Sequence, residues 1–188
     1  NGLYGGGAEK VLQTLLHYID KSKFEITLYS LRQEKLNNLF PKDITYRYIF
    51  SSYPEQSSFL RKILVKCKNK ILLWIYYHCS PRIFYKLCIR EAYDIEVAFI
   101  EGYATRIISG SPNPNSKKTA WVHTNLETNH WTTIAFQNKK EEEEAYAKFY
   151  QVISVSQSVQ ATTEKLFKDI NNNITQYNPI DANNIIQL

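Results

Sequence analysis

The chain of 188 residues contains no methionine and little cysteine, glycine or proline, with three, six and six residues of each. So little glycine and proline excludes collagen-like and low-complexity chains. The cysteines, Cys67, Cys79 and Cys88, match neither a zinc-ligand spacing nor a paired disulfide framework. They predict free thiols in a reducing compartment, so we expect a cytoplasmic protein. No apolar run reaches the roughly 18 residues of a membrane span. Because methionine is absent, we expect the chain to be a piece of a longer protein.

What the sequence does contain is typical of a globular domain, with 44% hydrophobic and 22% charged residues. Acidic residues are absent from one 30-residue stretch, residues 61–90, which carries eight of the 23 basic residues. The rest of the chain has 15 basic and 18 acidic residues, so this basic block accounts for the whole net charge of +5. Such a block favours an anionic partner, unless it is only a solvated helical face.

Hydrophobic periodicity predicts helices alternating with strands along the whole chain. Helices are expected over residues 8–19, 56–78, 81–91, 103–109, from 141 to Phe149, and 157–169. Strands are expected over residues 24–29, 44–50, 95–100, 119–123, 152–156 and 174–177. The apolar run 95–100 predicts a strand buried on both faces, and the acids Glu141–Glu144 predict a solvated first helical turn. The alternation predicts an α/β, Rossmann-like domain, with a mostly parallel sheet covered by helices on both faces.

A glycine-rich turn, Gly5-Gly6-Gly7, leads into the first helix at Ala8. Glycines at a helix N-terminus let a phosphate approach the backbone, although a tight strand-to-helix turn accounts for them equally well. The spacing is neither a dinucleotide fingerprint nor a P-loop. Because such a turn follows the first strand in parallel α/β folds, we expect a missing apolar strand of about six residues before Asn1, in the middle of the sheet.

Five segments in order resemble family 4 (group 1) glycosyltransferases. The segments are the GGAEK loop at 6–12, a strand and loop at 93–102, a W-x-H strand end at 120–125, a strand before a helix at 153–156, and an NPID segment at 177–181. The resemblance implies a GT-B fold, of which residues 1–178 would be the N-terminal, acceptor-side domain. Residues 179–188 would begin the linker to a C-terminal donor-binding domain whose motifs this chain lacks.

The resemblance therefore implies the acceptor-binding half of a retaining glycosyltransferase, which transfers a sugar from a nucleotide sugar to a cell-surface polysaccharide or lipid-linked acceptor. The nucleotide sugar would be a co-substrate, with no other cofactor and no metal. The isolated chain is expected to have no transferase turnover, because half of the cleft is absent. The alternative is a non-catalytic Rossmann-like domain that binds a small anionic ligand.

Candidate site residues cluster at predicted strand ends, where open α/β sheets bind ligands. Backbone N–H groups of the loop Gly5–Ala8 would face the donor diphosphate. By resemblance His123 would hydrogen-bond the donor sugar or diphosphate, and Glu101 would bind an acceptor hydroxyl or act as a base, or else only cap a helix. The acceptor-side candidates are Thr105, Asn125, His130 and Ser156, the last of which also fits a simple helix cap.

The basic block interleaves its cations with aromatic and aliphatic side chains. This pattern fits an anionic membrane or a core face with a solvated basic side, and it fits nucleic acid least. We expect no nucleic-acid partner and a possible peripheral position on the inner face of the cell membrane.

Overall fold

The computed structural model describes residues 6–34, 40–53, 57–170 and 172–180. Two compact units make up the chain: Asn1–Leu72 together with Asn178–Leu188, and Leu73–Tyr177. Each unit is described by itself below. The long helix α2 (Phe59–His78) begins in the first unit and ends in the second. Gly5 and residues 181–188 lie outside the described residues, and the strand expected before Asn1 stays a prediction.

The first unit contains helix α1 (Gly7–Tyr18) and a parallel pair of strands, β1 (Thr27–Arg32) and β2 (Thr45–Phe50). Leu12 and Leu16, one turn apart, are buried on one face of α1, as the periodicity predicted. The first strand was expected at residues 24–29 but begins three residues later. The reason is its partner: β1 pairs with β2 from Thr27 opposite Thr45 onwards.

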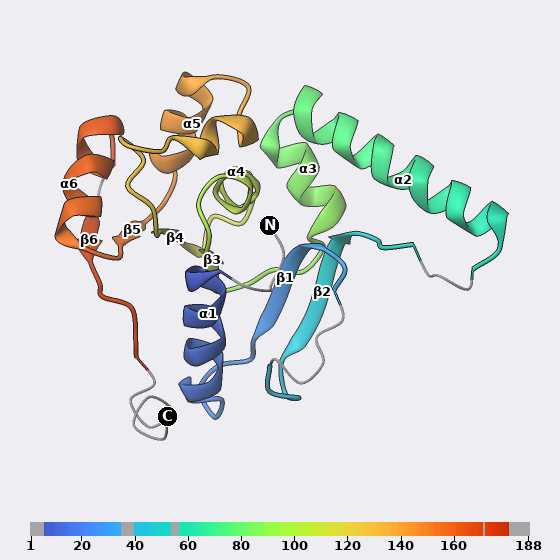
Figure 1. The fold of residues 1–188 in the computed structure, drawn as a ribbon, viewed down its shortest axis with the longest axis horizontal. Coiled ribbons are helices and arrows are strands. Elements are labelled where there is room, and N and C mark those ends of the chain that lie inside the picture. The colour runs from blue at the N-terminus through green and yellow to red at the C-terminus, as the bar shows by residue number, and fades with distance from the viewer. Residues whose placement is uncertain (1–5, 35–39, 54–56, 171, 181–188) are drawn as a thin grey trace. The chain divides into compact units, whose positions relative to one another are not determined.

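The second unit is a four-stranded parallel sheet in the order β3-β4-β5-β6, with helices between successive strands (Figure 1). Helix α6 runs alongside β5 and β6. The predicted fold class, α/β with mostly parallel strands, is confirmed. The elements after α2 are α3 (Pro81–Cys88), β3 (Ile95–Ala98), α4 (Tyr103–Ser109), β4 (Lys117–Val122), the 3-10 helix η1 (Trp131–Ala135), α5 (Lys139–Tyr146), β5 (Gln151–Ser154), α6 (Gln157–Leu166) and β6 (Asn173–Thr175).

The core of the second unit lies between this sheet and helices α4, α5 and α6. Side chains from β3, β4 and β5 meet aromatic and aliphatic residues of the helices and of the segments that follow them. Its buried members are Ala98, Ala120, Val122, Leu126, Tyr146, Phe149, Val152, Val159 and Phe167. Phe149 lies beyond the C-terminal end of α5, which is shorter than expected, yet its side chain still reaches this core.

The prediction that strand 95–100 is buried on both faces is wrong. Helix α4 covers the face of β3 that carries Ala98, because Ala104 and Ile108 pack against that residue's cluster. On the other face Ile95 and Val97 are 50% and 46% exposed. Burial in β3 therefore alternates, as in a strand with one covered face.

The expected solvated acidic turn at Glu141–Glu144 is also partly wrong. Asn138 caps α5 by accepting a hydrogen bond from the Glu141 N–H, at 2.9 Å. This places the Glu142 side chain in the interior, fully buried. Glu141 forms a 2.7 Å ion pair with Arg106, which is itself buried. Two of the four carboxylates thus belong to internal polar contacts.

Arg106 also fixes the end of α2. Its guanidinium donates to the backbone carbonyls of Tyr76 and Cys79 and lies 4.4 Å from the centre of the Tyr76 ring. The Tyr76 hydroxyl in turn donates to the Ala135 carbonyl at 2.7 Å. The last carbonyls of a helix have no partner within the helix, and here a buried cation satisfies the one at Tyr76.

Candidate functional site

The candidate site lies at the carboxyl ends of β3 and β4 in the second unit. The two strands are parallel neighbours, so the segments that follow them, Phe99–Gly102 and His123–Asn125, leave the same edge of the sheet. Ligands bind at this edge in open α/β sheets. Of the predicted residues, the structure brings Glu101 and His123 together here.

Glu101 holds the segment that follows β4. Its carboxylate is buried and accepts hydrogen bonds from the backbone N–H of His123, at 3.2 Å, and from the hydroxyl of Thr124. The next residue, Gly102, has a φ of +82°, and a Cβ there would lie 3.2 Å from the Trp131 ring. Only glycine fits this turn without strain. Glu101 is thus a buried clamp on the His123 loop.

The His123 imidazole is held in one orientation at the sheet edge. Its Nε2 lies 2.9 Å from the Phe99 carbonyl oxygen, and because a carbonyl only accepts, Nε2 carries the proton in this contact. The ring lies 5.0 Å from the Phe99 ring and is stacked 6.0 Å from the Trp121 ring. The side chain is half-buried, so it borders both the core and the edge where a ligand would lie.

A second polar cluster includes His130. Its Nε2 lies 2.9 Å from the buried Glu142 carboxylate, which also accepts a 2.6 Å hydrogen bond from the Thr132 hydroxyl. Burial raises the pKa of the Glu142 carboxyl, and the hydrogen bond from Thr132 and the neighbouring His130 oppose that shift. His130, predicted as an acceptor contact in a loop, is thus paired with an internal carboxylate.

Tyr146 connects the two clusters electrostatically. Its side chain is fully buried and stacks on Phe167 at 4.3 Å. Burial raises the pKa of the Tyr146 phenol well above its ordinary value, and the charges of Glu101 and Glu142 raise it further. Both carboxylates therefore act on the same phenol behind the sheet edge.

The remaining acceptor-side candidates have local structural contacts. Thr105 is fully buried beside Tyr146. The Asn125 side chain accepts from the backbone N–H groups of Glu127 and Thr128 and forms a turn. Ser156 caps α6 by accepting from the Val159 N–H at 3.3 Å, which is the capping interpretation. An acceptor role for any of them stays a prediction.

The predicted phosphate loop belongs to the first unit. Gly6 is the residue before α1, whose N-terminus has no side-chain cap, and a Cβ at Gly7 would meet nothing within 4 Å. The Glu9 carboxylate folds back onto Gly6, where an added Cβ would meet it. Gly6, Gly7 and Ala8 thus border a helix N-terminus beside which a carboxylate already lies.

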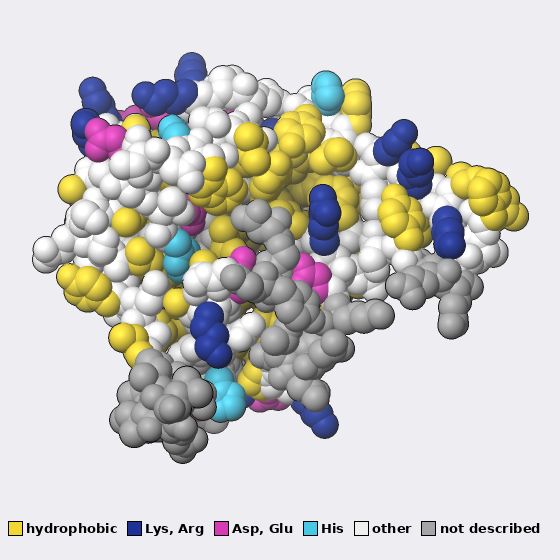
Figure 2. All heavy atoms as spheres, viewed as in Figure 1, with side chains coloured by type: hydrophobic (Ala, Val, Ile, Leu, Met, Phe, Trp, Pro, Cys, Tyr) yellow, Lys and Arg dark blue, Asp and Glu magenta, His cyan; other side chains and the backbone are white. Residues whose placement is uncertain are grey.

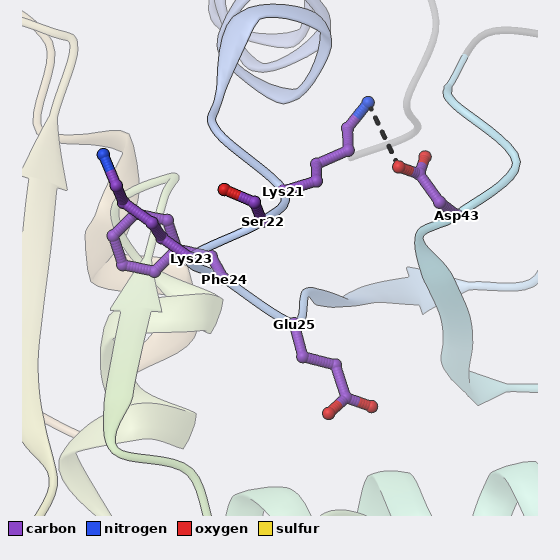
Figure 3. Close-up of a pocket in the computed structure, with 6 residues that line it drawn as sticks. All are labelled: Lys21, Ser22, Lys23, Phe24, Glu25 and Asp43. Carbon is purple, nitrogen blue, oxygen red and sulfur yellow. Dashed lines mark ion pairs between the residues drawn. The ribbon is translucent and has the colours of Figure 1, made fainter.

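An open hollow in the first unit lies elsewhere, around the turn between α1 and β1. Figure 3 shows Lys21 and Asp43 pointing toward each other, 3.4 Å apart, while Lys23 and Glu25 point away in different directions. The charged side chains that line this hollow do not converge on one point, so we do not treat the hollow as a candidate site. Among the residues that the structure describes, no group of three or more His, Cys, Asp or Glu side chains is placed to hold a metal ion.

Sequence reasoning missed Glu142, Tyr146 and Arg106 as members of internal polar networks. The sequence signal that could have revealed the burial of Glu142 was Tyr146. The two residues are four positions apart and share one helical face, so a buried Tyr146 predicts that Glu142 also faces the core.

A scan against protein-family models and searches of curated proteins and of solved structures found no match to this chain. The family resemblance therefore stays a prediction.

Proposed function

We propose that this chain is the acceptor-binding half of a retaining glycosyltransferase, which uses a nucleotide sugar and delivers the sugar to a polysaccharide or lipid-linked acceptor. The observation that carries the proposal is the oriented His123 imidazole at the carboxyl edge of a parallel sheet. Sugar transfer needs a placed acceptor hydroxyl and a stabilised leaving diphosphate. A half-buried imidazole fixed at this edge suits a contact to the donor sugar or its diphosphate.

In this proposal Glu101 is a positioning residue. Its carboxylate is buried and receives hydrogen bonds from the His123 N–H and the Thr124 hydroxyl. It therefore acts by holding His123 where the substrate binds. Glu101→Gln keeps the shape of the side chain but replaces one acceptor oxygen by a donor, which conflicts with one of the two donors it now receives.

The test uses the full-length protein, a panel of nucleotide sugars and a saccharide acceptor, with transfer followed by product formation. His123→Ala should lower kcat/KM by about one to three orders of magnitude, as the loss of a transition-state hydrogen bond does. The matched control is His17→Ala, because His17 is exposed on α1 and should leave the rate unchanged. A change below about threefold for His123→Ala would remove His123 from the reaction.

The alternative function, a non-catalytic domain that binds a small anion, rests on the N-terminus of α1. That helix end lacks a side-chain cap, but Glu9 already supplies a negative charge beside it. An anion would have to displace this carboxylate, which makes the alternative the weaker proposal. Glu9→Gln removes the competing charge, so pyrophosphate should bind this variant more tightly than the unaltered chain if the alternative holds; equal affinities would exclude it.

A further inference from the structure

Helix α2 exposes most of its large hydrophobic side chains. Leu60 is 72% exposed, Leu64 69%, Ile71 59% and Trp74 58%, whereas only Tyr76 is buried among its described residues. Figure 2 shows hydrophobic and basic side chains side by side over this helix. A soluble helix normally has its apolar side chains on the anchored face, and α2 departs from that rule over five turns.

Four of the exposed hydrophobic side chains, Leu60, Leu64, Ile71 and Trp74, lie on one stripe, whereas Phe59, Ile63 and Leu73 are exposed to one side of it. Positions 60, 64, 67, 71, 74 and 78 are separated alternately by four and three residues, which places them on one side of a helix. They are Leu60, Leu64, Cys67, Ile71, Trp74 and His78. Trp74 and His78 are stacked, with ring centres 4.9 Å apart. We call these six residues the apolar stripe.

The opposite side of α2 is the one that anchors it. Asn69 exchanges two hydrogen bonds with the Ser51 backbone, at 2.9 and 3.3 Å, and Tyr76 is buried against Phe84 and Tyr103. Asn69 and Tyr76 are seven residues apart, and on a helix they lie roughly opposite the apolar stripe. The stripe therefore points away from the contacts that hold the helix.

Cations border the apolar stripe on both sides. Arg61 and Lys68 lie along one border, and Lys66 and Lys70 along the other, as the 100° rotation per residue requires. All four are exposed, and no acid occurs within α2. Helix α3, which follows, also exposes hydrophobic side chains beside basic ones. Ile83 and Leu87, one turn apart, are 49% and 48% exposed beside Arg82 and Lys86.

We propose that the apolar stripe of α2, with its bordering cations, docks on the surface of an anionic lipid bilayer. An amphipathic helix of this kind lies in the interface, with its apolar side chains among the acyl chains and its cations at the anionic head groups. Cys67 would then lie in the middle of the buried side. This proposal does not rest on the proposed function.

The cations beside the apolar stripe argue against a second copy of the chain as the partner that covers it. The four-three spacing would also suit a two-stranded coiled coil, but Lys68 and Lys70 would then flank the seam and face cations of the other copy. No acid of α2 compensates that repulsion. An anionic bilayer instead satisfies the cations and the apolar side chains together. No helix among the described residues is long and apolar enough to cross a membrane.

The experiment is flotation of the whole chain with vesicles of neutral phosphatidylcholine, or of phosphatidylcholine with 30% phosphatidylglycerol. We expect binding to the anionic vesicles at about 50 mM salt, an at least tenfold loss of affinity at about 500 mM salt, and little binding to neutral vesicles. In the same samples a charged maleimide should modify Cys67 at least fivefold more slowly when anionic vesicles are present, as measured by peptide mass spectrometry.

Two pairs of matched variants test the surface itself. Lys66→Glu, Lys68→Glu and Lys70→Glu together should weaken binding by about 100-fold or more. The control triple, Lys140→Glu, Lys148→Glu and Lys168→Glu, lowers the net charge equally, since three reversals of two charges each take +5 to −1, and should bind far better than the α2 triple.

For the apolar stripe, Leu64→Asp with Ile71→Asp should abolish binding and the protection of Cys67. The control pair is Ile134→Asp with Tyr150→Asp, which changes equally exposed side chains outside α2 and should keep both. Absence of binding to vesicles of either composition at low salt would overturn the proposal. So would equal losses in the α2 and control triples, or a dimer in sedimentation velocity that the Leu64→Asp, Ile71→Asp pair dissociates.

Discussion

Replacing Arg106 by leucine should destabilise the second unit strongly. The guanidinium is buried, pairs with Glu141 at 2.7 Å, and donates to the carbonyls of Tyr76 and Cys79. Leucine supplies none of these bonds. Removing one partner of a buried ion pair costs about 3–5 kcal/mol, and each carbonyl left without a donor adds about 1 kcal/mol. Because Glu141 reaches solvent in part, we expect a total of about 3–5 kcal/mol.

The assay is urea unfolding followed by tryptophan fluorescence, because all three tryptophans, Trp74, Trp121 and Trp131, belong to the second unit. The control is Lys139→Ala on α5, which removes an exposed ion pair with Glu143 and should cost less than about 0.5 kcal/mol. The end of α2 should also exchange its amide hydrogens faster in Arg106→Leu. A loss of stability below about 1 kcal/mol, or one equal to that of the control, would refute the argument from burial.

Three further predictions concern stability. Gly102→Ala should cost about 1–3 kcal/mol, because its φ of +82° strains any other residue. Gly7→Ala at the open start of α1 should cost nothing or stabilise by up to about 1 kcal/mol, and thermal melts compare the two variants. Tyr76→Phe should cost about 1–2 kcal/mol through the lost bond to the Ala135 carbonyl, measured by urea unfolding. Burial raises the pKa of the Glu142 carboxyl, so the protonated carboxyl stabilises the native state. This contribution is lost as pH rises through the native pKa. Glu142→Gln should therefore lose less stability than the unaltered chain between about pH 4 and pH 7.

Local chemistry made parts of the fold predictable. Helix α4 begins and ends where the sequence indicated, because Gly102 and Gly110 bracket it. Strand β2 was predicted to within one residue from its alternating aromatics. Strand β1 was not, because the choice between residues 24–29 and 27–32 depends on pairing with β2, which no local pattern encodes.

The candidate site was predictable in position but not in its contacts. The sequence placed Glu101 and His123 at the ends of two predicted strands, and only the pairing of β3 with β4 shows that the two ends are neighbours. That Glu101 would bind the loop of His123 depends on the depth of its burial, which is a tertiary property. The same holds for Glu142: four consecutive acids favour a solvated helix end, and Glu142 faces the interior because it shares a helical face with the buried Tyr146 in a helix capped at Asn138.

Buried polar groups behind the sheet edge help to hold the loops of that edge in place. Glu101, Glu142 and Tyr146 are all buried, and burying them costs free energy that apolar side chains would not. The hydrogen bonds of the two carboxylates go to the segments that border the edge: Glu101 to the segment after β4, and Glu142 to the segment around His130. Each carboxylate thus fixes one loop directionally, which an apolar contact does not do. Such networks also serve a purely structural role, and loops held in one geometry are what the proposed binding edge would need.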